Sequence, residues 1–168
     1  MVLYFYSLDM IVREIEKHEI PLLEEFLYQA VFIPEGKERP GREILKLPKI
    51  AVYIKDFGKQ SDFCLVLQHE NKIIGAIWSR LFPENEKGFG FVDSDTPEIA
   101  MSVLQSYRKQ GVGTLLLKAM LDRLARNGYR QVSLSVDVLN YACKMYQKSG
   151  FITIGTSGES VTMIKKLS

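Results

Sequence analysis

Two basic residues and two glycines stand close together in the second half of the chain, and their spacing suits the binding of an anion. Arg108 and Lys109 precede Gly111 and Gly113, and a helical pattern follows at once. The first amides of a helix have no intrahelical acceptor, and the helix dipole places partial positive charge on them. Glycines allow a phosphate to approach this backbone closely, and the basic side chains add charge beside it. The segment therefore predicts a phosphate or pyrophosphate cradle.

Three other interpretations of these glycines compete with the cradle. A P-loop requires a lysine directly after the second glycine, but Thr114 stands there. A dinucleotide-binding fingerprint requires a third glycine at position 116, where the chain has Leu116. A tight strand-to-helix turn that binds no ligand is the third interpretation, and the residues by themselves leave it open.

Together with a second segment, residues 140–151, this pattern resembles one protein family. Arg108-x-x-Gly111-x-Gly113 resembles the Arg/Gln-x-x-Gly-x-Gly/Ala signature of the GNAT superfamily of N-acetyltransferases. The second motif of that family is Asn-x-x-Ala-x-x-x-Tyr-x-x-x-Gly-Phe. Four residues fall in its register: Ala142, Tyr146, Gly150 and Phe151. The motif would place its asparagine at Leu139, so Asn140 stands one residue late.

The resemblance implies acetyl-CoA as cosubstrate, an acyl-CoA N-acyltransferase fold and no metal. The pyrophosphate would lie on the amides of residues 108–114, and pantetheine would insert between two splayed parallel central strands. The cofactor-binding residues implied in this way are Met101, Val103, Arg108, Lys109, Gln110, Gly111, Val112, Gly113, Thr114, Asn140 and Tyr146. For Asn140, a plain helix N-cap is an alternative role, and both roles are compatible.

The resemblance also implies two catalytic residues for direct attack of an amine on the thioester. Tyr146 matches the tyrosine that acts as general acid toward the leaving sulfur, although a core tyrosine on an amphipathic helix is the alternative. Glu98, at the start of the central strand, would assist deprotonation of the amine through water, although a solvated strand end is the alternative. A non-catalytic acyl-CoA-binding sensor or regulatory module on the same fold is the alternative function.

In the family, the acceptor is bound by the first helix, the loop after it and the final hairpin. The acceptor-binding residues expected here are Phe32, Trp78 and Asp95. Aromatic residues are often ordinary core residues, which is the alternative for such positions. The acidic side chains just before the central strand suit a cationic acceptor, which would be the amine of a small molecule or of a peptide.

The elements that must position these residues follow from hydrophobic periodicity. Strands are expected at residues 10–15, 62–69, 72–82, 98–104, 132–138, 151–155 and 160–165, and helices after Pro21, after Gly111 and after Asn140. Residues 42–47 are expected to form one helical turn, residues 50–54 a strand or a helix end, and residues 83–97 a functional rim or an edge strand. The fold class is α/β with a mixed, mostly antiparallel twisted sheet of about six or seven strands and about four helices.

Composition limits the remaining possibilities. The 168 residues are expected to form one domain, with residues 1–9 as an N-terminal extension. A formal net charge of +2 gives no reason to expect a nucleic-acid partner, and no apolar run approaches the roughly 18 residues that span a membrane. Cys64 and Cys143 suit buried thiols in the cytoplasm, and two histidines are too few for a multi-histidine metal centre. A homodimer is one candidate assembly.

Overall fold

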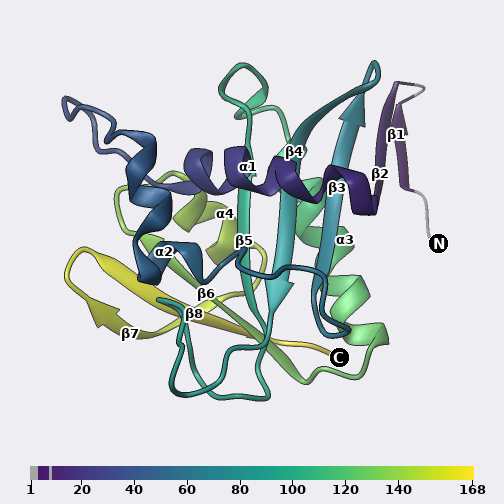
Figure 1. Cartoon of the computed structure of the whole chain (residues 1–168). Helices are drawn as coiled ribbons and strands as arrows, with labels where there is room; N and C mark the ends of the chain where they lie inside the picture. The colour runs from purple at the N-terminus through teal and green to yellow at the C-terminus, as the bar shows by residue number, and fades with distance from the viewer. Residues whose placement is uncertain (1–3, 8) are drawn as a thin grey trace.

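The computed structural model describes residues 4–7 and 9–168 of the chain (Figure 1). The strands are β1 (Tyr4–Ser7), β2 (Met10–Glu14), β3 (Phe63–His69), β4 (Lys72–Arg80), β5 (Glu98–Val103), β6 (Gln131–Asp137), β7 (Ile152–Ser157) and β8 (Ser160–Lys166). The α-helices are α1 (Leu23–Ala30), α2 (Pro48–Ala51), α3 (Val112–Arg126) and α4 (Ala142–Lys148). Short 3-10 helices are η1 (Lys17–Leu22), η2 (Arg42–Lys46) and η3 (Gln105–Tyr107).

One mixed sheet, in the order β1-β2-β3-β4-β5-β6-β8-β7, forms the centre of the fold. The β5–β6 pair is parallel and the other neighbouring pairs of described strands are antiparallel, which confirms the expected fold class. The described residues form eight strands, one more than the upper expected number, because Tyr4–Ser7 pairs with β2. The expected extension over residues 1–9 therefore contributes a strand, and residues 1–3 and 8 lie outside the description.

Helices cover both faces of the sheet and make two separate hydrophobic cores. Behind the sheet in Figure 1, α3 buries the stripe Val112, Leu116, Leu117, Ala119, Met120 and Leu124. In front of it, α1 and α2 cover a second core that includes Leu23, Phe26, Val66 and Trp78. Helix α3 ends as expected, because Gly128 has a φ of +84° and adopts the left-handed conformation after the last turn.

The two parallel strands separate soon after they begin. Glu98 pairs with Ser133, and the amide of Ser133 donates to the carbonyl oxygen of Pro97 at 3.0 Å. On their outer sides, β5 pairs along its length with β4, and β6 pairs along its length with β8. Each strand is therefore held by a different half of the sheet, and a gap opens between them as expected for the splayed pair.

The structure defines the segments before the central strand for which the sequence allowed more than one conformation. Pro21 lies in η1, and α1 begins two residues after it, at Leu23. Residues 42–46 form the expected single turn, and residues 48–51 form a helix rather than a strand. Residues 83–97 contain no strand, so they form a loop at the rim of the sheet. None of the helices in the described part of the chain has the length and apolar character that a membrane crossing requires.

Candidate functional site

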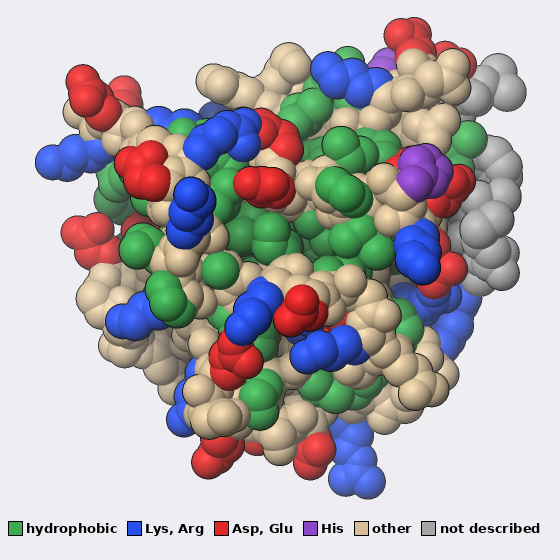
Figure 2. Space-filling model, in the orientation of Figure 1, with side chains coloured by type: hydrophobic (Ala, Val, Ile, Leu, Met, Phe, Trp, Pro, Cys, Tyr) green, Lys and Arg blue, Asp and Glu red, His purple; other side chains and the backbone are tan. Residues whose placement is uncertain are grey.

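A cavity of about 1050 Å³ opens between the splayed strands, α1, α4 and the start of α3. Figure 2 shows hydrophobic side chains gathered in the recessed centre of this face, with charged side chains around it. Most of the residues singled out from the sequence line this cavity: Phe32, Glu98, Met101, Val103, Arg108, Lys109, Gly111, Gly113, Thr114, Asn140 and Tyr146. Gln110, Val112, Trp78 and Asp95 do not line it.

The start of α3 presents backbone donors to the cavity. Gly111 is the N-cap residue with a φ of +85°, and a Cβ built on it would meet no atom within 4 Å. The amide of Leu115 makes the first intrahelical bond, to the carbonyl oxygen of Gly111 at 3.1 Å. The amides of Val112, Gly113 and Thr114 therefore have no acceptor within the helix, which is the anion cradle that the glycine spacing predicts.

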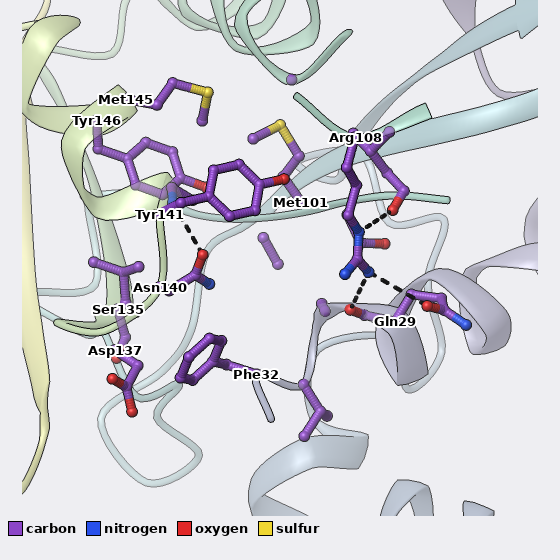
Figure 3. Close-up of a pocket in the computed structure, with 18 of the residues that line it drawn as sticks. Gln29, Phe32, Met101, Arg108, Ser135, Asp137, Asn140, Tyr141, Met145 and Tyr146 are labelled. Carbon is purple, nitrogen blue, oxygen red and sulfur yellow. Dashed lines mark hydrogen bonds between the residues drawn. The ribbon is translucent and has the colours of Figure 1, made fainter. Parts of the chain in front are cut away.

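Arg108 has a structural task beside this cradle. Its Nε donates to the carbonyl oxygen of Val103 at 2.8 Å, and its Nη2 contacts Gln29 at 3.4 Å (Figure 3). The guanidinium therefore ties the end of β5 to the end of α1 while its charge remains in the cavity wall. Lys109 lies with its Nζ 5.4 Å from the centre of the Tyr141 ring, a cation–π distance.

The neighbours of these basic residues do not reach the cavity with their side chains. The side-chain amide Nε2 of Gln110 donates to the carbonyl oxygen of Ser106 at 3.1 Å, and Val112 is a core residue only 2% exposed. The expected cofactor contacts of these two residues are therefore limited to their backbone. This follows from the helical geometry, because Val112 begins the stripe that packs on the sheet.

Helix α4 and the turn before it bring two of the expected residues, Tyr146 and Asn140, to the cavity (Figure 3). Tyr146 is 7% exposed, its ring meets Phe151 edge-on at 5.6 Å, and burial raises the pKa of its phenol. Oδ1 of Asn140 accepts the backbone amide of Ala142 at 3.0 Å, but the N-cap residue of α4 is Tyr141, so Asn140 lies one residue before the expected cap position. Both Asn140 and Tyr146 line the cavity.

Glu98 lies at the closed end of the gap, at the narrow part of the fork. Its side chain is 3% exposed, which excludes the solvated strand end as an interpretation. Burial raises the pKa of its carboxyl from 4.5 to about 7, although a hydrogen bond from the Tyr53 hydroxyl opposes part of the rise. A carboxyl that titrates near neutral pH inside a cavity is a candidate general base.

Two expected acceptor residues lie elsewhere. Trp78 is 1% exposed in the core beneath α1 and α2, where its indole N–H donates to the carbonyl oxygen of Tyr53 at 3.1 Å. Its role is therefore to hold Tyr53, not to contact an acceptor. Asp95 is exposed on the loop outside the cavity, where its amide donates to Asp93 at 2.9 Å. In this segment, Phe89 is the residue that lines the cavity.

Tyr53 and Asp137 are polar residues that line the cavity and that the sequence did not single out. Tyr53 follows a short helix far from either motif, and nothing in its neighbourhood marks it. Phe89, an aromatic residue that also lines the cavity, stands between two glycines, and a Cβ on Gly88 or Gly90 would lie within 3 Å of other atoms. Asp137 ends β6 directly before the second motif, and its Oδ1 accepts the amide of Leu139 at 2.8 Å.

The described residues bring together no group of three or more His, Cys, Asp or Glu that could bind a metal. Both cysteines are buried free thiols. No curated protein matches the chain significantly in sequence.

Solved structures share the fold over nearly the whole chain. A GNAT acetyltransferase from Streptococcus pneumoniae is 18% identical with a TM-score of 0.67, covering 95% of this chain and 100% of that one. The ribosomal-protein-S18-alanine N-acetyltransferase of Escherichia coli is 16% identical with a TM-score of 0.65, covering 95% and 94%. The PaiA N-acetyltransferase of Thermoplasma acidophilum, in complex with coenzyme A, is 16% identical with a TM-score of 0.67, covering 95% and 99%.

These structural similarities show the fold, and a match in sequence shows the family. The model of the acetyltransferase (GNAT) family matches residues 26–151, about three quarters of the chain. This match begins within α1 and includes the splayed strands, the amide cradle and the motif around Tyr146. The chain therefore belongs to the GNAT family of acetyltransferases.

Proposed function

We propose that the protein transfers the acetyl group of acetyl-CoA to a primary amine by direct attack of the amine on the thioester. The observation that carries the proposal is the single cavity joining three features. It begins at the free amides of α3, follows the gap between β5 and β6, and contains both Tyr146 and Glu98. Phosphate binding, an extended channel and an acid–base pair are the three requirements of this reaction.

The cavity fits acetyl-CoA at its phosphate end. The space around Gly111 is open, and the amides of Val112, Gly113 and Thr114 would hold the pyrophosphate with the charge of Arg108 nearby. Acetyl-CoA supplies the thioester, whose C–S bond breaks as the new C–N bond forms. The gap-facing backbone of Met101 and Val103 would bond the pantetheine amides in the manner of an added strand.

Glu98 would accept the proton that the amine loses. An alkylammonium with a pKa of roughly 10 is charged at neutral pH, and only the neutral amine is a nucleophile. With a pKa of about 7, Glu98 is partly ionised at neutral pH and is basic enough to take this proton, directly or through one water. Glu98, the base that the resemblance implies, lines the cavity, whereas Asp95 in the preceding loop does not.

Tyr146 would return a proton to the leaving sulfur. Its raised pKa keeps the phenol protonated at neutral pH, which is the state that a general acid needs. Burial among apolar neighbours such as Phe151 fixes the ring in one orientation. The cavity therefore contains a base at the fork and an acid on α4. The reaction requires both, because the amine loses one proton and the leaving sulfur gains one.

The acceptor would enter beside Phe32 and Asp137, which Figure 3 places on the same side of the cavity. The Asp137 carboxylate offers a partner for a cationic amine, and an aromatic face such as that of Phe32 also favours a cation. We infer an amine acceptor with positive charge, from a small molecule or a peptide.

Acetyl-CoA should raise the melting temperature of the protein, and a thiol-release assay should respond to a member of an amine panel. The panel should contain polyamines, aminoglycosides, amino acids and peptides with free N-terminal or lysine amines. An absence of CoA binding at millimolar concentration would contradict the proposal as a whole. Tight CoA binding without turnover on any amine would support the non-catalytic binding module instead.

A further inference from the structure

Tyr53 lies where three segments that border the cavity meet. It follows α2, its ring stacks on Phe89 with centroids 6.3 Å apart, and the edge of Phe82 approaches at 5.5 Å. Its hydroxyl donates to Oε2 of Glu98 and accepts the amide of Phe89 at 2.7 Å. A single phenol oxygen therefore joins the carboxylate on β5 to the loop of residues 83–97.

The backbone around Tyr53 is fixed from the sheet beneath it. The indole of Trp78 donates to the carbonyl oxygen of Tyr53 at 3.1 Å. Nη1 of Arg80 donates to the carbonyl oxygens of Val52 and Lys55 at 3.0 and 2.7 Å. Because all three bonds come from β4, which also pairs with β5, the phenol and the carboxylate are mounted on the same rigid part of the sheet.

The two oxygens of Glu98 have different surroundings. Oε2 is held by Tyr53, whereas Oε1 is buried and has no hydrogen-bond partner among the described residues. A Cβ on Gly88 would lie 2.3 Å from Oε1, so only glycine leaves room there. On β4, Arg80 stands opposite Glu98 in register, but its guanidinium is paired with Asp62 at 3.1 Å. Tyr53 is therefore the side chain that orients the carboxylate.

We propose that Tyr53 is a positioning residue of the acetyl transfer, which holds Oε2 of Glu98 and so fixes the carboxyl group at the fork for proton transfer from the acceptor amine. This inference rests on the proposed function, because it assumes that Glu98 is the base. A carboxylate held at one oxygen keeps the second at a fixed place and angle, as proton transfer over hydrogen-bond distance requires. The bond to Phe89 links this orientation to the loop at the cavity mouth.

The direct test measures the protonation of Glu98 without turnover. We would titrate the protein labelled with ¹³C at glutamate carboxyls by NMR and identify Glu98 as the signal lost in E98Q. In Y53F the midpoint should rise by about one pH unit, because the lost bond stabilises the ionised carboxylate. The matched control is Y28F, which removes a hydroxyl that bonds to the carbonyl oxygen of Pro40 at 2.6 Å. Its Glu98 midpoint should equal that of the unmodified protein.

A second measurement needs no Tyr53 variant. In the unmodified protein, the ¹³Cζ signal of Tyr53 should shift with pH at the same midpoint as the Glu98 carboxyl, because the phenol bonds to that carboxyl. The inference would be overturned if the Tyr53 signal did not shift at the Glu98 midpoint. It would also be overturned if the Glu98 midpoint were unchanged in folded Y53F. Either result would leave acetyl transfer itself untouched.

Kinetic measurements on Y53F distinguish a role in positioning Glu98 from a purely structural role of Tyr53. With an amine acceptor, Y53F should move the acidic limb of kcat/KM to higher pH by the same amount as the NMR midpoint. A structural role would instead lower activity by one factor at every pH. Lack of turnover in the unmodified protein would count against the proposed function alone, since the two NMR measurements would still decide the role of Tyr53.

Discussion

Glu98 on β5 pairs with Ser133 on β6 at the point from which the two parallel strands diverge. The buried carboxyl therefore lies at the narrow end of the fork, and the amides that follow Gly111 lie beyond its open end. The five residue steps from Glu98 to Val103 cover about 17 Å at ~3.3 Å per residue. An extended thiol arm along this strand would therefore be held by phosphate contacts at one end and would present its thioester near the base at the other.

Replacement of Glu98 by glutamine should lower kcat/KM by about 10²- to 10⁴-fold, the usual contribution of a general base. In the unmodified protein, activity should rise with pH through about 7, because Glu98 must be ionised to accept a proton. E98Q should lose this acidic limb. Measurement of kcat/KM between pH 5.5 and 9 with saturating acetyl-CoA would check both points. An acidic limb that survives in E98Q would assign the base to another group.

The same substitution should change how stability depends on pH. The pKa of Glu98 is raised from 4.5 to about 7 by burial, so the folded protein holds this proton more tightly than the unfolded chain. Stability is therefore lost as pH rises from about 4.5 through about 7, by up to about 3 kcal/mol. E98Q lacks this loss, so its stability relative to the unmodified protein should improve over that range. Denaturant unfolding at pH 4.5 and pH 8 would show it, and a constant difference would contradict it.

A negative side chain at Gly111 should block the phosphate cradle. G111E should weaken CoA binding about tenfold or more, a change of at least about 1.4 kcal/mol, because its carboxylate would repel the pyrophosphate. Gly128 offers a matched control at the other end of α3: it also has a positive φ and open space at its Cβ position. G128E shares the backbone strain but should leave CoA affinity unchanged in calorimetry. If CoA affinity fell equally in G111E and G128E, backbone strain alone would explain the effect.

The contrast between Trp78 and Gly111 explains how far the sequence predicted the site. The cradle follows from a local pattern, because the spacing of two glycines at the start of a helix fixes its geometry. Tyr146 and the splayed strands were instead implied by the resemblance to the GNAT superfamily. Trp78 and Tyr53 depend on which face of β4 packs under α2, a long-range contact that periodicity does not encode. For a related reason, the sequence indicated only an N-terminal extension at residues 4–7, because these apolar residues carry no turn signal that defines a hairpin with β2.

Asp137 should determine affinity for the acceptor. D137N should raise KM for a cationic amine about tenfold and leave kcat nearly unchanged, because the lost ion pair is present in both ground and transition states. The residue is half-buried and lines the cavity, so its charge is less screened than that of a surface carboxylate. Steady-state kinetics with varied amine would measure the effect. A rise of KM in D95N rather than in D137N would place the acceptor at the outer loop instead.

Removal of the Tyr146 hydroxyl should slow the chemical step without loosening the cofactor. Y146F should lower kcat by about 10²-fold and change the Kd of CoA less than about twofold, since the phenol would act only on the leaving sulfur. The thiol of roughly pKa 8.5 is a tolerable leaving group, which keeps the loss at the lower end of general-acid effects. Because the pKa of Tyr146 is raised, the phenol stays protonated, and the ratio of activities should be constant between pH 6 and 9. The control is Y129F, which removes a hydroxyl outside the cavity. If Y146F kept full activity, the role of Tyr146 would be limited to packing against Phe151.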